Sequence, residues 1–423
     1  MTDKAAQTEN TRSDSVPWRL QIAVYGIGLF STSMFYMSAI VVPLWIASIE
    51  QSVFLIGVAL GARHFLPLFL SIHGGVLMDR LGGRRVMVFF AAIGVAVPLL
   101  FPVMPIIWAA LVLQMISGLV DAMGWLGAQT LIGQHMKGST VYTGRLSYTC
   151  RAGHLIAPPA IGWVWDVGGP IWGFVGLSLW CVGTLLCSLA LPAARNPASP
   201  DSDDPPPRVR VADVMPRVSD YVGAFRLVAV PAIALVVMCS MMTHVGASVH
   251  STFYVVYLGD QGINGTQIGL LLSASSVAAA GGALIASWTA RRIRPYWLML
   301  GAILTSILAV AVTPLLGLFV LLVVASAVRG ASNGLTQPMV ISTVLRAVEP
   351  EKRGSAAGIR ATFNRVASIV SPILMGAVAE LTGIVNAFYF VGAMAIVLIG
   401  LLAIHVARSP VLSASNVVQR EES

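Results

Sequence analysis

Long apolar runs separated by short polar connections fill almost the whole chain. A helix of about 20 apolar residues crosses the hydrocarbon core of a bilayer. We place twelve such runs at residues 21–47, 53–78, 86–106, 107–131, 143–165, 170–192, 228–257, 266–288, 296–313, 317–344, 355–379 and 386–407. None alternates apolar and polar residues as a barrel strand would, so helices are expected. The pattern predicts an all-α membrane protein with twelve transmembrane helices.

The composition agrees with a chain that is surrounded mostly by lipid. Hydrophobic residues make up 57% of the 423 residues, and Asp, Glu, Lys and Arg together make up 10%, which is far from the balance of a soluble globular protein. The net charge of +8 is spread over the connections between helices, which disfavours nucleic-acid binding. The cysteines fall inside predicted helices without metal-ligand spacing, so we expect buried apolar side chains and neither a metal nor a cofactor. They are Cys150, Cys181, Cys187 and Cys239.

Basic residues between the predicted helices all lie on one side of the membrane. They occur in the N-terminal tail, in 195–226, in the C-terminal tail and at Arg80, Arg84, Arg85, Lys137, Arg291, Arg292, Arg294, Arg346, Lys352 and Arg353. The opposite connections carry acids near the helix ends, namely Glu50, Asp166, Asp260 and Glu380. The positive-inside rule therefore places both termini in the cytoplasm, in a multi-pass protein of the cytoplasmic (inner) membrane. The polar N-terminal tail is expected to stay attached, because the apolar run after it is too long for a signal-peptide core.

A segment rich in proline and charge, residues 196–220, divides the chain. Such a segment buries too little apolar surface to fold alone. The predicted organisation is a cytoplasmic N-terminal tail (1–20), an N-terminal six-helix bundle (21–192), a cytoplasmic linker (193–227), a C-terminal six-helix bundle (228–407) and a cytoplasmic C-terminal tail (408–423).

The two halves repeat one another. Ile56-Gly57 recurs 212 positions later as Ile268-Gly269, and Gly118 recurs at the same offset as Gly330. A longer pattern recurs at an offset of 214 positions. Its members in helix five are Arg151, Pro158, Gly162 and Asp166, and those in helix eleven are Arg365, Pro372, Gly376 and Glu380. We therefore expect two pseudo-symmetric bundles, an organisation with which many transporters place one site at the bilayer midplane.

The densest group of charges between two apolar runs is "GGVLMDRLGGRR", residues 74–85. Six of its residues fit the pattern G-x3-D-R-x-G-x-R-R: Gly75, Asp79, Arg80, Gly82, Arg84 and Arg85. This pattern is similar to the one that the major facilitator superfamily carries between its second and third helices. Together with the twelve helices, the cytoplasmic termini and the central linker, the chain resembles that family over nearly its whole length, which implies the same fold.

The resemblance implies a role for the six residues as a cytoplasmic gate motif. In the family, the aspartate equivalent to Asp79 binds the start of helix eleven and closes the cytoplasmic gate, an interaction with a helix dipole. Gly75 and Gly82 would allow close helix approach and a tight turn. The alternative is that the arginines only anchor the topology. The counterpart in the second half, residues 287–295, has Arg291 in place of the acid, and helix four lacks the cytoplasmic acid that relatives often add.

Ionisable residues inside a membrane are costly and point to function. The deep ones are Arg63, His64, Asp121, Arg151, His154, His244, Arg329, Arg360 and Arg365. Helices three, six, nine and twelve carry none before their ends. The resemblance implies that these four helices face lipid, while helices one, four, seven and ten line a central cavity.

Helix ten places Arg329, Asn333 and Gln337 on one face at spacings of four residues. Arg329 lies about 18 Å from either end of its helix, too deep for its guanidinium to reach the headgroups, so we expect a bound substrate or a charge partner. The expected cavity residues are Arg329, Asn333, Gln337, Gln114, Tyr36, Arg151 and Arg365. For the shallower Arg151, packing or snorkelling is the alternative.

Asp121 is the only carboxylate well inside the predicted hydrocarbon. It is the first candidate for a coupling proton, and a permanent salt bridge to a deep arginine such as Arg63 is the alternative. His64, His154 and His244 are further candidates because imidazole titrates near neutrality, although each could equally be a hydrogen-bonded interior histidine.

Several deep arginines against one deep acid predict an electropositive interior, which favours an anionic or amphiphilic solute. Aromatic and methionine side chains in helices one and seven either form an adaptable apolar wall or simply pack in the core. They are Phe35, Tyr36, Met37, Met241, Met242, Phe253 and Tyr254.

Helix five contains "GHLIAPPAIG", residues 153–162. The stretch is similar to the glycine- and proline-containing motif of proton antiporters in the family, with Ala157 and Trp163 in place of two glycines. The matching residues are Gly153, Pro158, Pro159 and Gly162. The prolines are expected to bend the helix, either as part of a gate or as a static kink. This partial match favours export.

These observations predict a secondary transporter that works by alternating access. Its expected partners are a small organic solute, protons as coupling ion and the lipid bilayer, and it is expected to act as a monomer. An uptake symporter of an organic anion and a transport-inactive sensor or scaffold are the alternatives. The sequence contains no phosphate-binding loop of the type G-x4-G-K-[ST], which disfavours an ATP-driven pump. Enzyme activity is not expected.

Overall fold

The computed structural model describes residues 16–136, 139–192, 230–349 and 353–409. Within helices α4, α6, α7, α13 and α14 the surroundings of some residues are not described, among them Gly75, Asp79 and Arg80. Within the described residues the regular structure is helical throughout, which confirms the all-α prediction.

The helices of the N-terminal half are α2 (Trp18–Ile49), α3 (Val53–Ala62), α4 (Phe65–Leu81), α5 (Gly83–Val103), α6 (Ile107–His135) and α7 (Thr140–Leu189). Those of the C-terminal half are α9 (Pro231–Ser251), α10 (Phe253–Asp260), α11 (Gly265–Arg292), α12 (Pro295–Ala311), the short 3-10 helix η3 (Thr313–Leu315), α13 (Phe319–Ala347), α14 (Arg353–Thr382) and α15 (Ile384–Arg408).

The predicted number of spans is confirmed. Ten helical segments of the described chain are long and apolar enough to cross a membrane. One of them, Val141–Leu189, holds two spans because Gly169 breaks the helix, and Pro295–Ala311 adds a shorter apolar helix. Gly169 (φ 75°) and Gly383 (φ 90°) occupy corresponding turns in the two halves, in a backbone region that favours glycine.

Several predicted boundaries were wrong by three or four residues. Helix α6 continues to His135 rather than 131, α7 begins at Thr140 rather than 143, and α5 is displaced from 86–106 to Gly83–Val103. An apolar run marks only the part of a helix that lies in lipid, whereas backbone hydrogen bonds continue into polar residues. The second span is also interrupted, at Arg63 and His64, and the seventh at Thr252.

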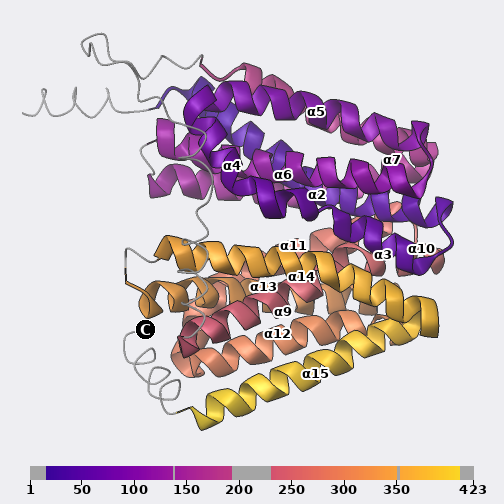
Figure 1. Ribbon diagram of the computed structural model, residues 1–423, viewed down its shortest axis with the longest axis vertical. Coiled ribbons are helices and arrows are strands. Elements are labelled where there is room, and N and C mark those ends of the chain that lie inside the picture. Colours follow the sequence, from indigo (N-terminus) through magenta and orange to yellow (C-terminus); the bar gives the residue numbers. More distant parts are fainter. Residues whose placement is uncertain (1–15, 137–138, 193–229, 350–352, 410–423) are drawn as a thin grey trace, which may run out of the picture.

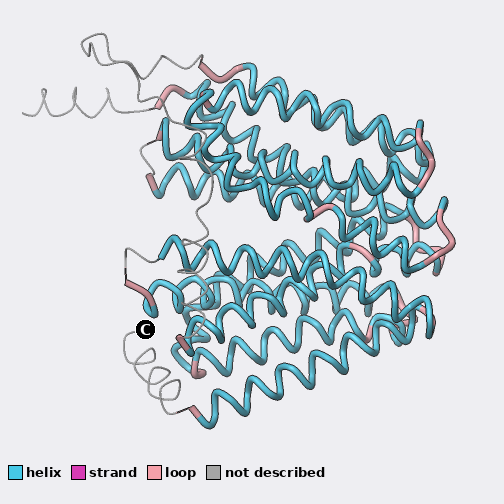
Figure 2. The backbone as a smooth tube through the Cα atoms, viewed as in Figure 1, coloured by secondary structure: helices cyan, strands magenta, loops and turns pink. Residues whose placement is uncertain are grey.

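The helices form two bundles, one from each half of the sequence (Figure 1). The described chain ends lie at the left in this view, and we call this side the terminal end. The opposite side, which holds Glu50, Asp166, Asp260 and Glu380, is the far end. The tube in Figure 2 shows the bundles apart at the terminal end and together at the far end. The predicted domain limits at 193–227 and 408–423 lie mostly outside the described residues and stay predictions.

Helix pairs from opposite halves close the far end. Helix α7 packs against α11, and α3 packs against α14. A Cβ atom at Gly57 would overlap the carbonyl oxygen of Pro372, and one at Gly269 would meet the carbonyl oxygen of Pro158. Only small residues let two helix backbones approach this closely. The repeated Ile-Gly pairs and the repeated prolines of the sequence therefore meet each other across the two halves.

Candidate functional site

Two adjoining cavities lie between the bundles. One, of about 490 Å³, is lined mainly by α2, α6, α7 and the break between α3 and α4. The other, of about 810 Å³, is lined mainly by α9, α11 and α13. They share the lining residues Phe35, Tyr36, His64 and Arg151. Both volumes are in the range of small-molecule sites. The space is therefore built from both halves and is closed on one side by the far-end contacts.

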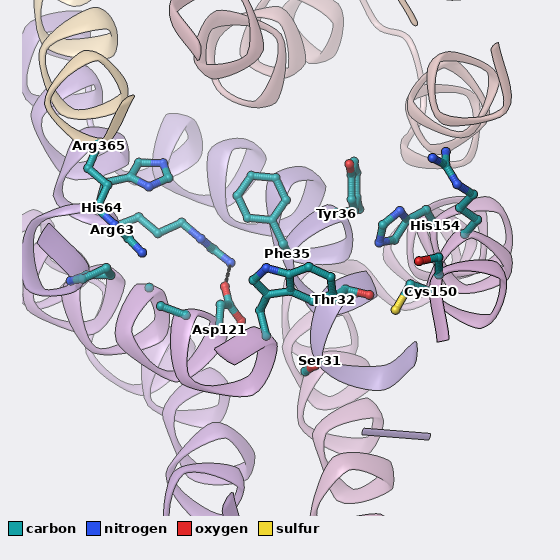
Figure 3. Close-up of a pocket in the computed structure, with 16 residues that line it drawn as sticks. Ser31, Thr32, Phe35, Tyr36, Arg63, His64, Asp121, Cys150, His154 and Arg365 are labelled. Atoms are coloured by element: carbon teal, nitrogen blue, oxygen red, sulfur yellow. Dashed lines mark hydrogen bonds and ion pairs between the residues drawn. The ribbon is translucent and has the colours of Figure 1, made fainter. Parts of the chain in front are cut away.

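Arg63 lines the smaller cavity and reaches across it toward Asp121 (Figure 3). Its guanidinium forms an ion pair with Asp121 and donates a hydrogen bond to Ser38 Oγ at 2.7 Å. A longer bond of 3.4 Å reaches Gln114 Oε1, and the guanidinium carbon lies 5.1 Å from the ring centre of Phe35. The sequence left open whether Asp121 pairs with a deep arginine, and the structure shows the pair with Arg63. Arg63 is therefore a buried cation with an acidic partner and further acceptors.

Arg329 occupies the larger cavity with fewer partners. Its Nη1 atom donates a hydrogen bond to Ser275 Oγ at 2.9 Å, while its Nε atom is buried without a hydrogen-bond partner among the described residues. Asn333, one helical turn further along α13, accepts a bond from Ser306 Oγ at 3.2 Å. Arg329 therefore has no acidic partner comparable to Asp121 within the described chain.

Histidines and aromatic rings line the space between these two arginines. The rings of Tyr36 and His154 are 4.4 Å apart, and His154 Nε2 has no hydrogen-bond partner in the described structure. His244 is bonded through Nδ1 to the carbonyl oxygen of Ser240 at 2.9 Å. Figure 3 shows Tyr36, His154 and Phe35 facing the same open region.

Most of the residues expected in the cavity line one of the two spaces. They are Tyr36, Asp121, Arg151, His154, His244, Arg329, Asn333, Gln337 and Arg365. Gln114 is buried beside Arg63 and lines a small pocket beneath it. Of the aromatic and methionine set, Phe35 and Tyr36 face the cavity, whereas Met37, Met242, Phe253 and Tyr254 are core side chains.

A carboxylate from helix α7 caps the start of α11 at the far end. Asp166 accepts hydrogen bonds from the backbone N–H groups of Gly265 (2.6 Å) and Thr266 (2.8 Å) and from the Thr266 hydroxyl (2.6 Å). These are the unpaired N–H groups that begin every helix, and they prefer a negative charge.

The other half repeats this arrangement. Glu380 of α14 accepts a hydrogen bond from the backbone N–H of Phe54 at 3.1 Å and one from Ser52 Oγ at 3.5 Å, at the start of α3. Phe54 lies 212 positions before Thr266, so equivalent backbone groups are bound. We call the Asp166 and Glu380 contacts the two inter-half caps.

The cytoplasmic gate motif is only partly described. The surroundings of Gly75 and the side chains of Asp79 and Arg80 are not described, so the gate role stays a prediction. Gly82 forms the turn between α4 and α5 with φ 84°. Arg84 donates a hydrogen bond to the carbonyl oxygen of Leu189 at 3.1 Å, and Arg85 is exposed.

The helix-five residues pack against other helices. Gly153 lies against Ser33 of α2, Pro158 and Pro159 lie against Gly269, and Gly162 lies against Gly265. The α7 helix continues through both prolines, and its non-helical residue is Gly169. Pro158, Pro159 and Gly162 therefore belong to the inter-half contact that closes the far end, whereas Gly153 packs within the N-terminal half.

Sequence reasoning missed two residues beside Arg329. Ser275 stands 212 positions after Arg63, so the repeat carried a signal for it. His250 lies inside the seventh predicted span and is 4% exposed. The capping roles of Asp166 and Glu380 were also missed, because spacing shows that they correspond but not what they touch.

Comparison with known proteins agrees with this architecture. The profile of the Major Facilitator Superfamily matches residues 24–259 and 236–421. The chain is 26% identical over 398 residues to the enterobactin exporter EntS of Citrobacter koseri, covering 90% of this chain and 88% of that protein. It is 25% identical over 401 residues to EntS of Salmonella typhi, with the same coverage.

Solved structures of transporters share the fold. The nucleoside transporter NupG superposes with a TM-score of 0.67 at 16% identity, covering 90% of this chain and 97% of that one. A bacterial homolog of the human lysosomal transporter Spinster, in an inward-facing and unoccupied conformation, gives a TM-score of 0.68 at 13% identity, covering 96% and 98%. With the family profile spanning both halves and the two-bundle architecture in place, the chain belongs to the Major Facilitator Superfamily and is a multi-pass membrane transporter of that family.

Proposed function

We propose that the protein exports a small organic solute across the cytoplasmic membrane by alternating access, in exchange for protons. The observation that carries this proposal is a cavity lined by both halves, closed at the far end by two symmetry-related helix contacts. A rocking motion that breaks these contacts would expose the same residues to the other side. The export direction is supported by the relatives named as enterobactin exporters and by the helix-five motif.

The orientation proposed for the chain has both termini in the cytoplasm. Basic residues of the described chain gather at the terminal end, as Arg84, Arg145, Arg292 and Arg408, while the acids named above mark the far end. The positive-inside rule assigns the terminal end to the cytoplasm. The cavity in this structure then faces the cytoplasm, the side from which an exporter loads its solute.

Alternating access is tested with one cysteine in the cavity. Ser276 lines the larger cavity, and we place Ser276→Cys in a chain whose four native cysteines are replaced by alanine. A membrane-impermeant maleimide is expected to label this cysteine from both faces, in right-side-out and in inverted vesicles. Labelling from the terminal side alone would contradict a transport cycle and would favour a scaffold.

Asp121 is proposed to carry the coupling proton, since it is the carboxylate that lines the cavities in the described chain. Asp121→Asn is expected to abolish accumulation driven by a pH gradient while leaving solute exchange without a gradient. The measurement uses inverted vesicles with an acidic interior and three labelled probes, 2-naphthoate, uridine and tetraphenylphosphonium. The probe that accumulates in the parent protein is then followed in the variant.

The matched control separates proton transfer from a permanent salt bridge. Asp121→Asn alone leaves the buried Arg63 unpaired, which costs about 3–5 kcal/mol, so the double variant with Arg63→Gln is expected to recover thermal stability. If Asp121 carries the proton, gradient-driven accumulation stays lost in the double variant. Recovery of driven accumulation would identify Asp121 as a structural partner only.

A further inference from the structure

The buried arginines of the two halves differ in their charge partners. The repeat offset of 212 pairs Arg63 with Ser275 and Asp121 with Asn333. In the N-terminal half the cation and its acid are both present and bonded. In the C-terminal half an amide stands at the acid position and is bonded to Ser306, while the cation comes from Arg329. The described C-terminal half thus has the positive member of the pair without a negative one.

Arg329 is too buried for water to compensate its charge fully. The residue is 7% exposed, and its Nε atom has no hydrogen-bond partner in the described structure. An isolated buried cation carries an effective penalty of several kcal/mol unless an opposite charge or a set of acceptors is supplied. Ser275 supplies one acceptor. Most of this penalty is therefore left for another group to offset.

A second buried nitrogen points to the same missing partner. His250 is 4% exposed and its Nε2 atom also lacks a hydrogen-bond partner among the described residues. Its ring stacks on Tyr254 at 4.6 Å, and Tyr254 is held by a hydroxyl bond to Ser326 Oγ at 3.1 Å. His250 and Arg329 line the same cavity.

The charges of the whole cavity have predominantly one sign. Four arginines line the two adjoining spaces, namely Arg63, Arg151, Arg329 and Arg365, and the carboxylate found among the described lining residues is Asp121, which Arg63 already binds. Coulomb attraction in such a partly desolvated space favours an anion. The neighbouring rings of Phe35 and Tyr36 offer an apolar surface to the rest of a ligand.

We propose that the cavity binds organic anions, with the carboxylate of the ligand against Arg329 and His250 and its apolar body along Phe35 and Tyr36. A carboxylate supplies the paired acceptors that a guanidinium prefers, and it replaces the acid that the repeat lacks at Asn333. This assignment of substrate class rests on the proposed transport function. It makes Arg329 the residue that selects for charge.

The test compares two probes that differ in charge and hardly in shape, 2-naphthoate and 2-naphthamide. Binding to the purified full-length protein is measured by calorimetry and by the shift of the unfolding temperature, because a ligand of the folded state raises it. Naphthoate is expected to bind at least tenfold more tightly than naphthamide. Equal affinities, or an equal response to chloride at the same concentration, would overturn the proposal.

Variants then assign the preference to Arg329. Arg329→Gln is expected to lower naphthoate affinity at least tenfold and to leave the weak binding of naphthamide unchanged, whereas Arg329→Lys keeps part of the preference. Arg292→Gln is the matched control, since Arg292 lies over Trp288 at the terminal end, and it should bind both probes like the parent. An unchanged naphthoate preference in Arg329→Gln would overturn the proposal.

A second readout separates a binding residue from a structural one. Removing an uncompensated charge is expected to raise the unfolding temperature of ligand-free Arg329→Gln, as often happens when a functional residue is replaced. Should that variant fail to fold, His250→Phe is the deciding variant, because it keeps an aromatic ring against Tyr254 and removes both ring nitrogens. It is expected to weaken naphthoate about tenfold, and parent-like naphthoate binding would count against the site.

Failure of the site and failure of the function remain distinguishable. If binding through Arg329 is charge-selective but the cavity cysteine is labelled from one face only, the transport function is contradicted and the anion site is supported. If the cysteine is labelled from both faces but naphthoate is not preferred, the anion site is contradicted and the transport function is supported.

Discussion

Replacing Asp166 by asparagine and Glu380 by glutamine together is expected to open the far end of the protein. Each carboxylate joins one half to the first N–H groups of a helix in the other half. Hydrogen bonds to a charged group contribute about 1.5–3 kcal/mol each, and a helix N-terminus adds about 0.3–1 kcal/mol for a negative charge. An amide keeps one acceptor oxygen but loses the charge, so the closed far end loses much of this stabilisation.

The two inter-half caps should not contribute equally. Asp166 has three contacts between 2.6 and 2.8 Å, whereas Glu380 has two, at 3.1 and 3.5 Å. We expect Asp166→Asn alone to cost the closed far end about 2 kcal/mol, a population shift of roughly 30-fold. Glu380→Gln alone should have a smaller effect.

The opening is measured as a change of distance between spin labels. A pair at Met104 and Leu315, which are exposed at the far end in opposite halves, should gain a longer component. A pair at Arg145 and Arg292, at the terminal end, should gain a shorter one. Asp260→Asn is the control, because Asp260 lies at the far end outside both caps. Parent-like distances at both ends in the double variant would show that the caps do not hold the far end.

The caps also illustrate what a single sequence contains and what it lacks. The spacing shared by Asp166 and Glu380, and the Ile-Gly pairs at 56–57 and 268–269, predicted that these elements correspond. It could not predict that the acid of one half binds the helix start of the other half. That contact depends on the crossing of α7 with α11 and of α3 with α14, which is a property of tertiary packing.

The buried charges likewise separate what the sequence can predict from what depends on tertiary packing. Depth along a helix follows from residue count, so the burial of Arg329 could be predicted from the sequence. The identity of a partner depends on helix rotation, so the sequence left the pairing of Arg63 with Asp121 open and missed Ser275 and His250. The break at Arg63 and His64 was missed because apolar residues flank it on both sides, so the whole stretch was taken as one span. The number of spans, by contrast, depends only on apolar length, and that prediction was confirmed.

Replacing Gly330 by alanine is expected to destabilise the C-terminal half severely. Helices α11 and α13 touch backbone to backbone, and a Cβ atom at Gly330 would overlap the carbonyl oxygen of Ser275. Neither backbone can move away without separating the helices. Overpacking of this kind costs about 1–3 kcal/mol or more, whereas alanine gains at most about 1 kcal/mol over glycine from helix propensity. The steric cost therefore dominates.

The neighbouring glycines of α11 provide a matched pair of controls. A Cβ atom at Gly282 would overlap the carbonyl oxygen of Ala331, whereas one at Gly281 meets nothing within 4 Å. Gly282→Ala should lower the unfolding temperature like Gly330→Ala, and Gly281→Ala should leave it unchanged or raise it slightly. If Gly330→Ala has the same unfolding temperature as Gly281→Ala, the close contact between α11 and α13 is contradicted.

Because Gly281 and Gly282 lie in one helix and have the same helix propensity, the difference between their variants isolates the α11–α13 contact. That contact holds Ser275 beside Arg329, so the variants that separate the helices should also weaken naphthoate binding.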